Sequence, residues 1–244
     1  MSASEPTGYG GLGFKAIVRR VSCMWPVKLW GTLACAAGFM LLYFAAQRWG
    51  WREAVAVPTT RIDEWVGFDP GWTLMYESLW LLLPIAPWLA GRAEDIRRYL
   101  IGFGMMCAVA FPVFFLWPMD APRPEVVPDH TLYRWLVSID GTRNSLPSMH
   151  AALGVYTVFV SANQLRELLS PWAWRVAVVM GWVWLLCILY ATLTTKQHGV
   201  IDLPPGMLLG GMAYCVAWRA RARLDLKGVI CRFSKRTSGV SSSS

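Results

Sequence analysis

The sequence is poor in charged residues. Asp, Glu, Lys and Arg make up 16% of its 244 residues, whereas average usage in soluble domains is about 25%. Hydrophobic residues make up 55% of the chain and include 15 tryptophans. The low charge excludes an ordinary soluble domain, and the apolar residues gather in runs close to the ~20 residues that a membrane helix needs. We therefore predict an all-α integral membrane protein.

Three other signals are absent. The six cysteines include no C-x-x-C pair, which disfavours zinc sites and disulfide frameworks. No basic motif interleaved with aromatic residues is present, so the formal charge of +8 does not predict a nucleic-acid partner. No cleavable signal peptide is visible, because the first apolar run starts late and is long. We expect isolated thiols and a first span that is retained.

Six apolar runs predict six transmembrane helices in one bundle. They lie at about residues 27–46, 72–89, 99–117, 148–165, 174–193 and 200–218. Together they form a membrane catalytic domain at 26–220. A basic cytoplasmic segment at 1–25 precedes this domain, and a basic cytoplasmic tail at 221–244, which we expect to be disordered, follows it.

The distribution of positive charge predicts the orientation in the membrane. Most of the 23 Lys and Arg residues lie in the two terminal segments and in the turns at 90–98 and 166–175. The positive-inside rule therefore places both termini in the cytoplasm of a multi-pass protein of the inner (cytoplasmic) membrane. The polar interval 118–147 and the turn 194–199 then face outward.

Ionisable groups lie against apolar runs at two places. Residues 143–150 read Arg-Asn-Ser-Leu-Pro-Ser-Met-His, and His198 and Asp202 stand at the head of the last run. Pro147-Ser148 is typical of a helix start, whose free first-turn amides attract an anion. The i, i+4 spacing favours one helix face for His198 and Asp202. Pro204-Pro205 instead favour a helix that starts near 200–203, with both residues at its entrance.

The residue types at these two places suit phosphoryl transfer. A carboxylate at one ring nitrogen of His198 fixes the tautomer and leaves the other nitrogen as a nucleophile. Asp202 is that carboxylate, and His150 can protonate a leaving oxygen. No metal cage or cofactor is needed. The candidates for binding phosphate oxygens are Arg123, Arg143, Asn144, Ser148 and Lys196.

These motifs resemble those of a known family. Pro-Ser-Met-His at 147–150 and His-x-x-x-Asp at 198–202 resemble the second and third signatures of the type 2 phosphatidic acid phosphatase superfamily, and Arg123-Pro124 resembles the end of the first. The resemblance covers about residues 99–218. It implies a six-helix membrane fold with an extracytoplasmic, metal-independent site. By that resemblance His198 is the nucleophile, Asp202 orients it, His150 is the general acid, and Arg123 and the Ser148 region bind phosphate.

The sequence departs from the family pattern once in each of the three signatures. Leu116 stands where the first signature has Lys, Ala191-Thr192 stand where the third has Ser-Arg, and Met149 replaces a Gly. Lys196 and Arg143 are candidates to replace the two missing cations. This looser form resembles the branch that contains the inositol phosphorylceramide synthases and similar bacterial proteins, whose members transfer head groups.

Several functions stay open at this point. We expect hydrolysis of a lipid phosphate or a polyprenyl (pyro)phosphate through a phosphohistidine, because water is available at an outward face. The alternatives are head-group transfer between lipids, an intramembrane serine protease using Ser148 and His198, and a transporter or scaffold with a degenerate site. For a phosphoryl-transfer site we expect His150 and His198 to face one another across a phosphate-sized gap; side chains on different faces of the bundle would contradict this function. Glu77, inside the second predicted span, fits a functional carboxylate or a plain interhelical hydrogen bond equally well.

Overall fold

The computed structural model describes residues 9–124 and 127–219, so the predicted tail at 221–244 lies outside the described residues. Two short strands, β1 (Val55–Ala56) and β2 (Met119–Asp120), pair in parallel. The 3-10 turns lie at Pro70–Trp72 and Val200–Asp202, and a π-helical turn lies at Cys215–Arg219. The α-helices are α1 (Tyr9–Ser22), α2 (Trp25–Trp49), α3 (Arg61–Val66), α4 (Thr73–Glu77), α5 (Leu79–Leu82), α6 (Ile85–Leu89), α7 (Ala93–Leu116), α8 (Thr131–Ile139), α9 (Met149–Leu165), α10 (Pro171–Thr194) and α11 (Leu203–Tyr214).

In the described ranges, four helical segments are long and apolar enough to cross a membrane. They are Trp25–Trp49, Ala93–Leu116, Pro171–Thr194 and Val200–Trp218. These segments fit a membrane protein, and each overlaps one of the six predicted spans. The six-span count and the cytoplasmic placement of both termini stay predictions.

The other two predicted spans have a different form. The run at 72–89 is divided into α4, α5 and α6, with breaks at Ser78 and at Leu83-Pro84. Pro84 and Pro87 lack the N–H that an uninterrupted helix would need there. α9 has 17 residues and is therefore about 26 Å long at 1.5 Å per residue, slightly less than the ~30 Å hydrocarbon core.

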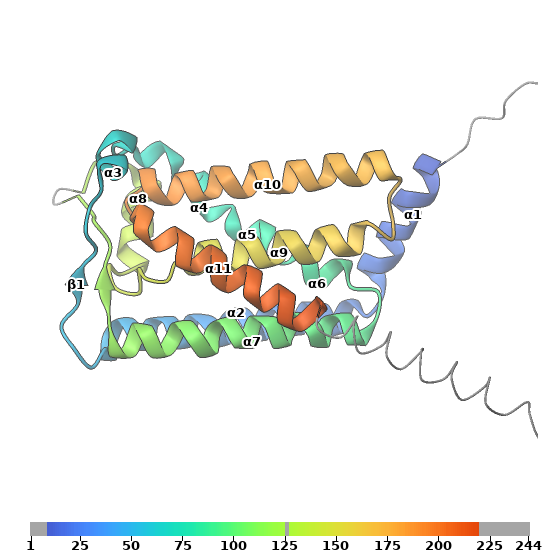
Figure 1. The fold of residues 1–244 in the computed structure, drawn as a ribbon, viewed down its shortest axis with the longest axis horizontal. Helices are drawn as coiled ribbons and strands as arrows, with labels where there is room; N and C mark the ends of the chain where they lie inside the picture. Colours follow the sequence, from blue (N-terminus) through green and yellow to red (C-terminus); the bar gives the residue numbers. More distant parts are fainter. Residues whose placement is uncertain (1–8, 125–126, 220–244) are drawn as a thin grey trace, which may run out of the picture.

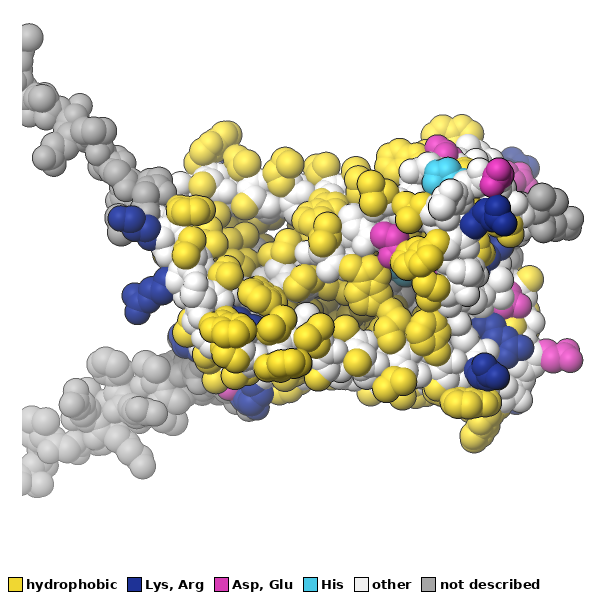
Figure 2. All heavy atoms as spheres, turned by 180° about the vertical axis from the view of Figure 1, so that it is seen from behind, with side chains coloured by type: hydrophobic (Ala, Val, Ile, Leu, Met, Phe, Trp, Pro, Cys, Tyr) yellow, Lys and Arg dark blue, Asp and Glu magenta, His cyan; other side chains and the backbone are white. Residues whose placement is uncertain are grey.

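Helix α9 is the central helix of the bundle. In Figure 1, α2 and α7 run side by side along one edge, α10 runs along the other, and α9 and α11 lie between them. Most α9 residues are buried, among them Ala151, Ala152 and Tyr156. In Figure 2, hydrophobic side chains cover the length of the bundle, and most charged groups gather at its two ends.

Helices α9 and α11 pack against each other through their backbones. A Cβ atom added at Gly206 would lie 2.2 Å from the Ser148 carbonyl oxygen, and one added at Gly210 would lie 2.2 Å from the Ala152 carbonyl oxygen. Small residues that allow such close approach are typical of helix pairs in membranes. This contact fixes the start of α11 against the start of α9, where both predicted site motifs lie.

Candidate active site

The start of α9 positions the first histidine. The Ser148 hydroxyl oxygen accepts a hydrogen bond from the Ala151 amide at 3.3 Å, which is N-capping geometry. The Ser148 amide donates to the Asp202 carbonyl oxygen at 3.1 Å. The helix start that Pro147-Ser148 predicts is therefore confirmed, and His150 lies in its first turn.

The turn after α10 positions the second histidine. The amides of Gln197 and His198 donate to the Thr192 carbonyl oxygen at 3.0 and 3.2 Å. A 3-10 turn over Val200–Asp202 follows, and α11 begins at Leu203. The prediction that His198 and Asp202 share one helix face is wrong, because His198 precedes the helix. The late helix start that Pro204-Pro205 favour is confirmed.

The two histidines and the aspartate form a connected group. His150 Nδ1 and His198 Nε2 are 3.2 Å apart, and His198 Nδ1 lies 3.5 Å from Asp202 Oδ2. His198 is 5% exposed and Asp202 is fully buried. A carboxylate beside Nδ1 favours the tautomer with hydrogen on that nitrogen. The Nε2 lone pair of His198 then accepts the hydrogen bond from His150 Nδ1–H.

The distance between the histidines differs from the expected one. The two rings face one another, but their nitrogens are in direct contact, so the expected phosphate-sized gap between them is wrong. His150 also packs on the ring of Tyr76, with ring centroids 4.4 Å apart. One of the two histidine rings must therefore move before a phosphorus atom can come between the two nitrogens.

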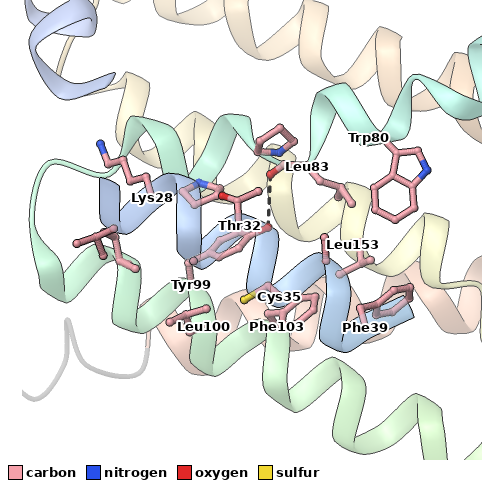
Figure 3. A pocket seen from close by; sticks show the side chains of 16 residues that line it. Lys28, Thr32, Cys35, Phe39, Trp80, Leu83, Tyr99, Leu100, Phe103 and Leu153 are labelled. Carbon is pink, nitrogen blue, oxygen red and sulfur yellow. Dashed lines mark hydrogen bonds between the residues drawn. The ribbon is translucent and has the colours of Figure 1, made fainter. Parts of the chain in front are cut away.

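A cavity of about 370 Å³ opens beside the histidine pair. Its polar walls are formed by His150, His198, Asn144, Asp140 and Glu77. A second, apolar cavity of about 190 Å³ adjoins it between α2, α6 and α7, and the two have walls in common. Figure 3 shows these common residues toward one end of the apolar cavity, with Lys28 at the other: Phe39, Trp80, Leu83 and Leu153.

The predicted phosphate-binding cations lie elsewhere. Two guanidinium nitrogens of Arg123 donate to the carbonyl oxygens of Asp140 and Gly141, at 2.6 and 2.9 Å, and one also donates to the Gln197 side-chain oxygen. The Lys196 ammonium donates to the Asp63 carbonyl oxygen at 2.7 Å. Burial lowers the pKa of Lys196 from its usual value, and the charge of Asp63 partly offsets this.

Arg143 also lies outside the histidine cavity. Its guanidinium approaches the Gln47 carbonyl oxygen at 3.4 Å, and it lines a separate surface hollow with Arg48. Of the predicted phosphate-binding residues, Asn144 is the one that lines the cavity beside His150 and His198. Ser148 is fully buried, and its hydroxyl caps α9.

The segment that contains these residues matches a known protein family. The family model of the PAP2 superfamily matches residues 99–225. The chain belongs to the PAP2 superfamily. No curated protein and no solved structure matches the chain. The PAP2 match confirms the resemblance inferred from the sequence motifs, and members of this superfamily are phosphatases or phosphotransferases.

The PAP2 match contains all three connected residues, His150, His198 and Asp202, but it does not contain the whole cavity. Tyr76, Glu77 and the cavity-lining residues of α2 precede residue 99. The histidines and the lining residues of α8 therefore belong to the PAP2 segment, and the lining residues of α2 and α4 come from a part of the chain that the family match does not cover.

Sequence reasoning did not single out three residues of the site. The Ser145 hydroxyl donates to Asp202 Oδ2 at 2.5 Å and lies 3.4 Å from His198 Nδ1. The Tyr76 hydroxyl donates to Asp140 Oδ2 at 3.1 Å. Ser145 lies inside the polar octet and Asp140 three residues before it, so their positions were a usable signal. The sequence around Tyr76 contained no such signal apart from the carboxylate of the adjacent Glu77.

The described residues contain no group of three or more His, Cys, Asp or Glu side chains that could hold a metal ion. His198 and Asp202 are instead connected by the contact at Nδ1, by the Ser145 hydroxyl, and by the Gly199 amide, which donates to Asp202 Oδ2 at 2.8 Å. This arrangement leaves one nitrogen of His198 directed toward His150. It is suited to nucleophilic attack followed by proton transfer.

Proposed function

We propose that this protein is a lipid phosphoryl-transfer enzyme that works through a phosphohistidine on His198. The reaction takes place at the extracytoplasmic face of the inner membrane and requires no metal ion. The observation that carries the proposal is the 3.2 Å contact between His150 Nδ1 and His198 Nε2, with Asp202 beside the other nitrogen of His198.

Each residue has a defined role in this reaction. His198 Nε2 attacks phosphorus, so that an N–P bond forms while the bond from phosphorus to the leaving oxygen breaks. His150, protonated on both ring nitrogens, gives its Nδ1 proton to that oxygen and becomes neutral. Water or an alcohol then attacks phosphorus, the N–P bond breaks, and His150 takes up the proton of the attacking group. The Ala151 amide is taken by the Ser148 hydroxyl, so the amides of Met149 and His150 in the first turn of α9 bind phosphate oxygens.

A lipid substrate is supported by the surroundings of the site. The histidine cavity has walls in common with the apolar cavity bordered by Cys35, Tyr99 and Phe103 (Figure 3). A lipid chain that enters this cavity from the bilayer exchanges one apolar environment for another and meets few polar groups there. A phosphate at the histidines would thus have its lipid chain beside it, between α2 and α7.

Two versions of the reaction differ in the substrate. The first is hydrolysis of a lipid phosphate or polyprenyl (pyro)phosphate, whose terminal phosphate carries about −1.5 to −2 charges. The second is transfer of a phospho-head group from a phosphodiester lipid, whose phosphate carries a single charge. The three candidate cations donate to backbone carbonyl oxygens and do not line the cavity: Arg123, Arg143 and Lys196. This observation favours the second version, because a singly charged phosphodiester needs fewer cations to neutralise it than a phosphate monoester does.

The serine protease alternative has less support. Ser148 is fully buried and its hydroxyl caps α9. Ser145 lies on the Nδ1 side of His198, together with Asp202. A serine nucleophile needs the opposite arrangement, with its hydroxyl at the nitrogen that faces away from the aspartate.

The decisive variant is His198→Ala. We expect purified protein in detergent with EDTA to process a panel of phospholipids, scored for both free phosphate and new lipid products. His198→Ala should lower kcat by at least about 10³-fold, because the nucleophile is lost, and should not form the phosphorylated adduct. His130→Ala is the matched control, since His130 is a half-buried N-cap of α8 that does not line the histidine cavity. Full activity in His198→Ala would contradict the proposal.

A further inference from the structure

The electrostatic character of the histidine cavity is unusual for a site that receives phosphate. Among the described residues that line it, none is Lys or Arg, whereas two carboxylates, Glu77 and Asp140, do line it. A dianionic phosphate alone would meet negative charge on this wall. The cavity therefore suits a ligand that brings a positive charge of its own.

The two carboxylates differ in how they are compensated. Asp140 Oδ1 accepts hydrogen bonds from the Tyr43 hydroxyl at 2.8 Å and from Gln47 at 3.1 Å, and Arg123 lies 3.7 Å from Asp140 Oδ2. Glu77 hydrogen-bonds with the Trp80 side chain, but no cation of the described chain lies within 4 Å of it. A half-buried carboxylate inside an apolar bundle is costly without a cation.

The cavity wall also contains a buried hydrogen-bond acceptor that has no donor, and this feature is independent of Glu77. Asn144 is 2% exposed, and its side-chain N–H donates to the Tyr43 carbonyl oxygen at 3.0 Å. Its Oδ1 atom is buried and has no hydrogen-bond partner within the described chain. A buried acceptor of this kind loses about 1–3 kcal/mol unless a donor reaches it. Asn144 lines the same cavity as Glu77 and supplies a neutral acceptor there.

Aromatic rings complete the surroundings of Glu77. Tyr76 and Trp80 flank it in the sequence and line the cavity with it, together with Trp135 from α8. Aromatic faces attract ammonium groups, and most strongly where water is excluded. A carboxylate, a free amide oxygen and several aromatic rings together form the surroundings that proteins use to bind an ammonium ion.

We propose that the cavity binds the ammonium group of a zwitterionic phosphodiester lipid, with Glu77 as its counter-ion. This inference rests on the proposed function and narrows the substrate to lipids whose phosphate carries an ethanolamine or choline substituent. An ethanolamine ammonium can also donate an N–H to Asn144 Oδ1, whereas choline, which has no N–H, contacts only Glu77 and the rings. The phosphate lies at His150 and His198, the ammonium lies at Glu77 and the rings of Tyr76 and Trp80, and the hydrocarbon chains extend toward the apolar cavity.

The position of the ammonium selects the bond that breaks. His198 Nε2 forms the N–P bond, the bond from phosphorus to the glycerol oxygen breaks, and that oxygen leaves with the proton of His150 as diacylglycerol. The phospho-head group stays on His198, because Glu77 holds its ammonium. An acceptor hydroxyl, or water, then forms the new O–P bond while the N–P bond breaks and its proton returns to His150.

Binding to the His198→Ala variant tests the ammonium site separately from catalysis. Dioleoyl phosphatidylethanolamine, phosphatidylcholine, phosphatidylglycerol and phosphatidic acid are compared by native mass spectrometry at equal concentration. We expect phosphatidylethanolamine or phosphatidylcholine to bind about tenfold more tightly than phosphatidylglycerol, which has the same chains and phosphodiester but no ammonium. Adding Glu77→Gln should remove the preference, and Glu77→Asp should retain part of it.

Glu53→Gln is the matched control, because Glu53 is exposed in the loop before β1 and should leave the preference intact. Equal binding of the zwitterionic lipids and phosphatidylglycerol would overturn the inference, as would a preference that survives Glu77→Gln. Turnover by the wild-type protein reports on the proposed function. Turnover of phosphatidic acid without an ammonium preference overturns only the ammonium site, and an ammonium preference without turnover of any lipid overturns only the proposed reaction.

Discussion

The two walls of the histidine cavity are built differently. The catalytic wall, formed by α9 and the start of α11, is packed through its backbone, and α9 is mostly buried. The substrate wall, formed by α2 and α4–α6, includes a helix at the outside of the bundle: most apolar residues of α2 are not covered by protein, and α4–α6 are short and interrupted. Reacting nitrogens need fixed positions, and the backbone contact between α9 and α11 provides them. The catalytic wall therefore contacts mainly protein, whereas α2 is open to the surroundings of the bundle.

The largest loss of stability and activity is expected when the contact between α9 and α11 is disrupted. Gly210→Ala places a Cβ atom 2.2 Å from the Ala152 carbonyl oxygen, so α9 and α11 must separate. We expect a destabilisation of about 3 kcal/mol or more and loss of activity, measured by thermal unfolding in detergent and by turnover.

Gly211→Ala is the matched control for this variant. It lies one residue further along α11 and has nothing within 4 Å of its added Cβ. The same change should be neutral there, or stabilising by up to about 1 kcal/mol through helix propensity. Equal behaviour of the two variants would show that the backbone contact between α9 and α11 does not hold the site together.

A smaller effect is expected at the edge of the catalytic wall. Arg123 connects Gly141 to Gln197, the neighbour of His198, so we assign it a positioning role. Arg123→Lys cannot reproduce the forked contacts and should lower kcat by about tenfold to 10²-fold with little change in KM. Arg134→Lys, on an exposed pair with Asp129, is the control. A higher KM with unchanged kcat would support the sequence hypothesis that Arg123 binds phosphate.

The smallest effect is expected on the substrate wall. Ala36 lines the apolar cavity, and Ala36→Phe fills part of it. We expect a KM for long-chain lipids that is higher by about three- to tenfold, equivalent to about 0.7–1.4 kcal/mol, with no change for a short-chain analogue. Ala34→Phe, on the exposed side of the same helix, should have no effect. An equal change for both chain lengths would place the lipid outside this cavity.

The sequence predicts the helix starts on the catalytic wall better than the form of the substrate wall. Pro147-Ser148 and Pro204-Pro205 define the beginnings of α9 and α11, because proline and capping residues act locally. The run at 72–89 reads as one apolar segment, but Ser78 and Pro84 divide it. Hydrophobicity reports where a chain is apolar, and it does not report whether the helix is continuous.

The cations show why the rest of the site was not predictable from sequence. Lys196 is two residues from His198, and Arg143 is five residues before Ser148, yet neither lines the cavity. Left-handed backbone at Lys196 and at Asn144, with φ of 55° and 73°, turns the chain sharply at these two places. Distance along the sequence does not give the direction of a side chain through such turns. Tyr76 and Glu77 come from a distant helix that only the tertiary fold brings to the histidines.

The hydrogen bond from the Ser148 amide to the Asp202 carbonyl oxygen joins two segments that the ribosome makes at different times. The two residues are separated by the whole of α9 and α10, so the ribosome delivers the first histidine well before the second. A nascent chain whose last helix is not yet inserted has His150 without its partner. For the proposed reaction this means that the site is complete only when the final helix docks, so unfinished chains in the membrane would lack the activity.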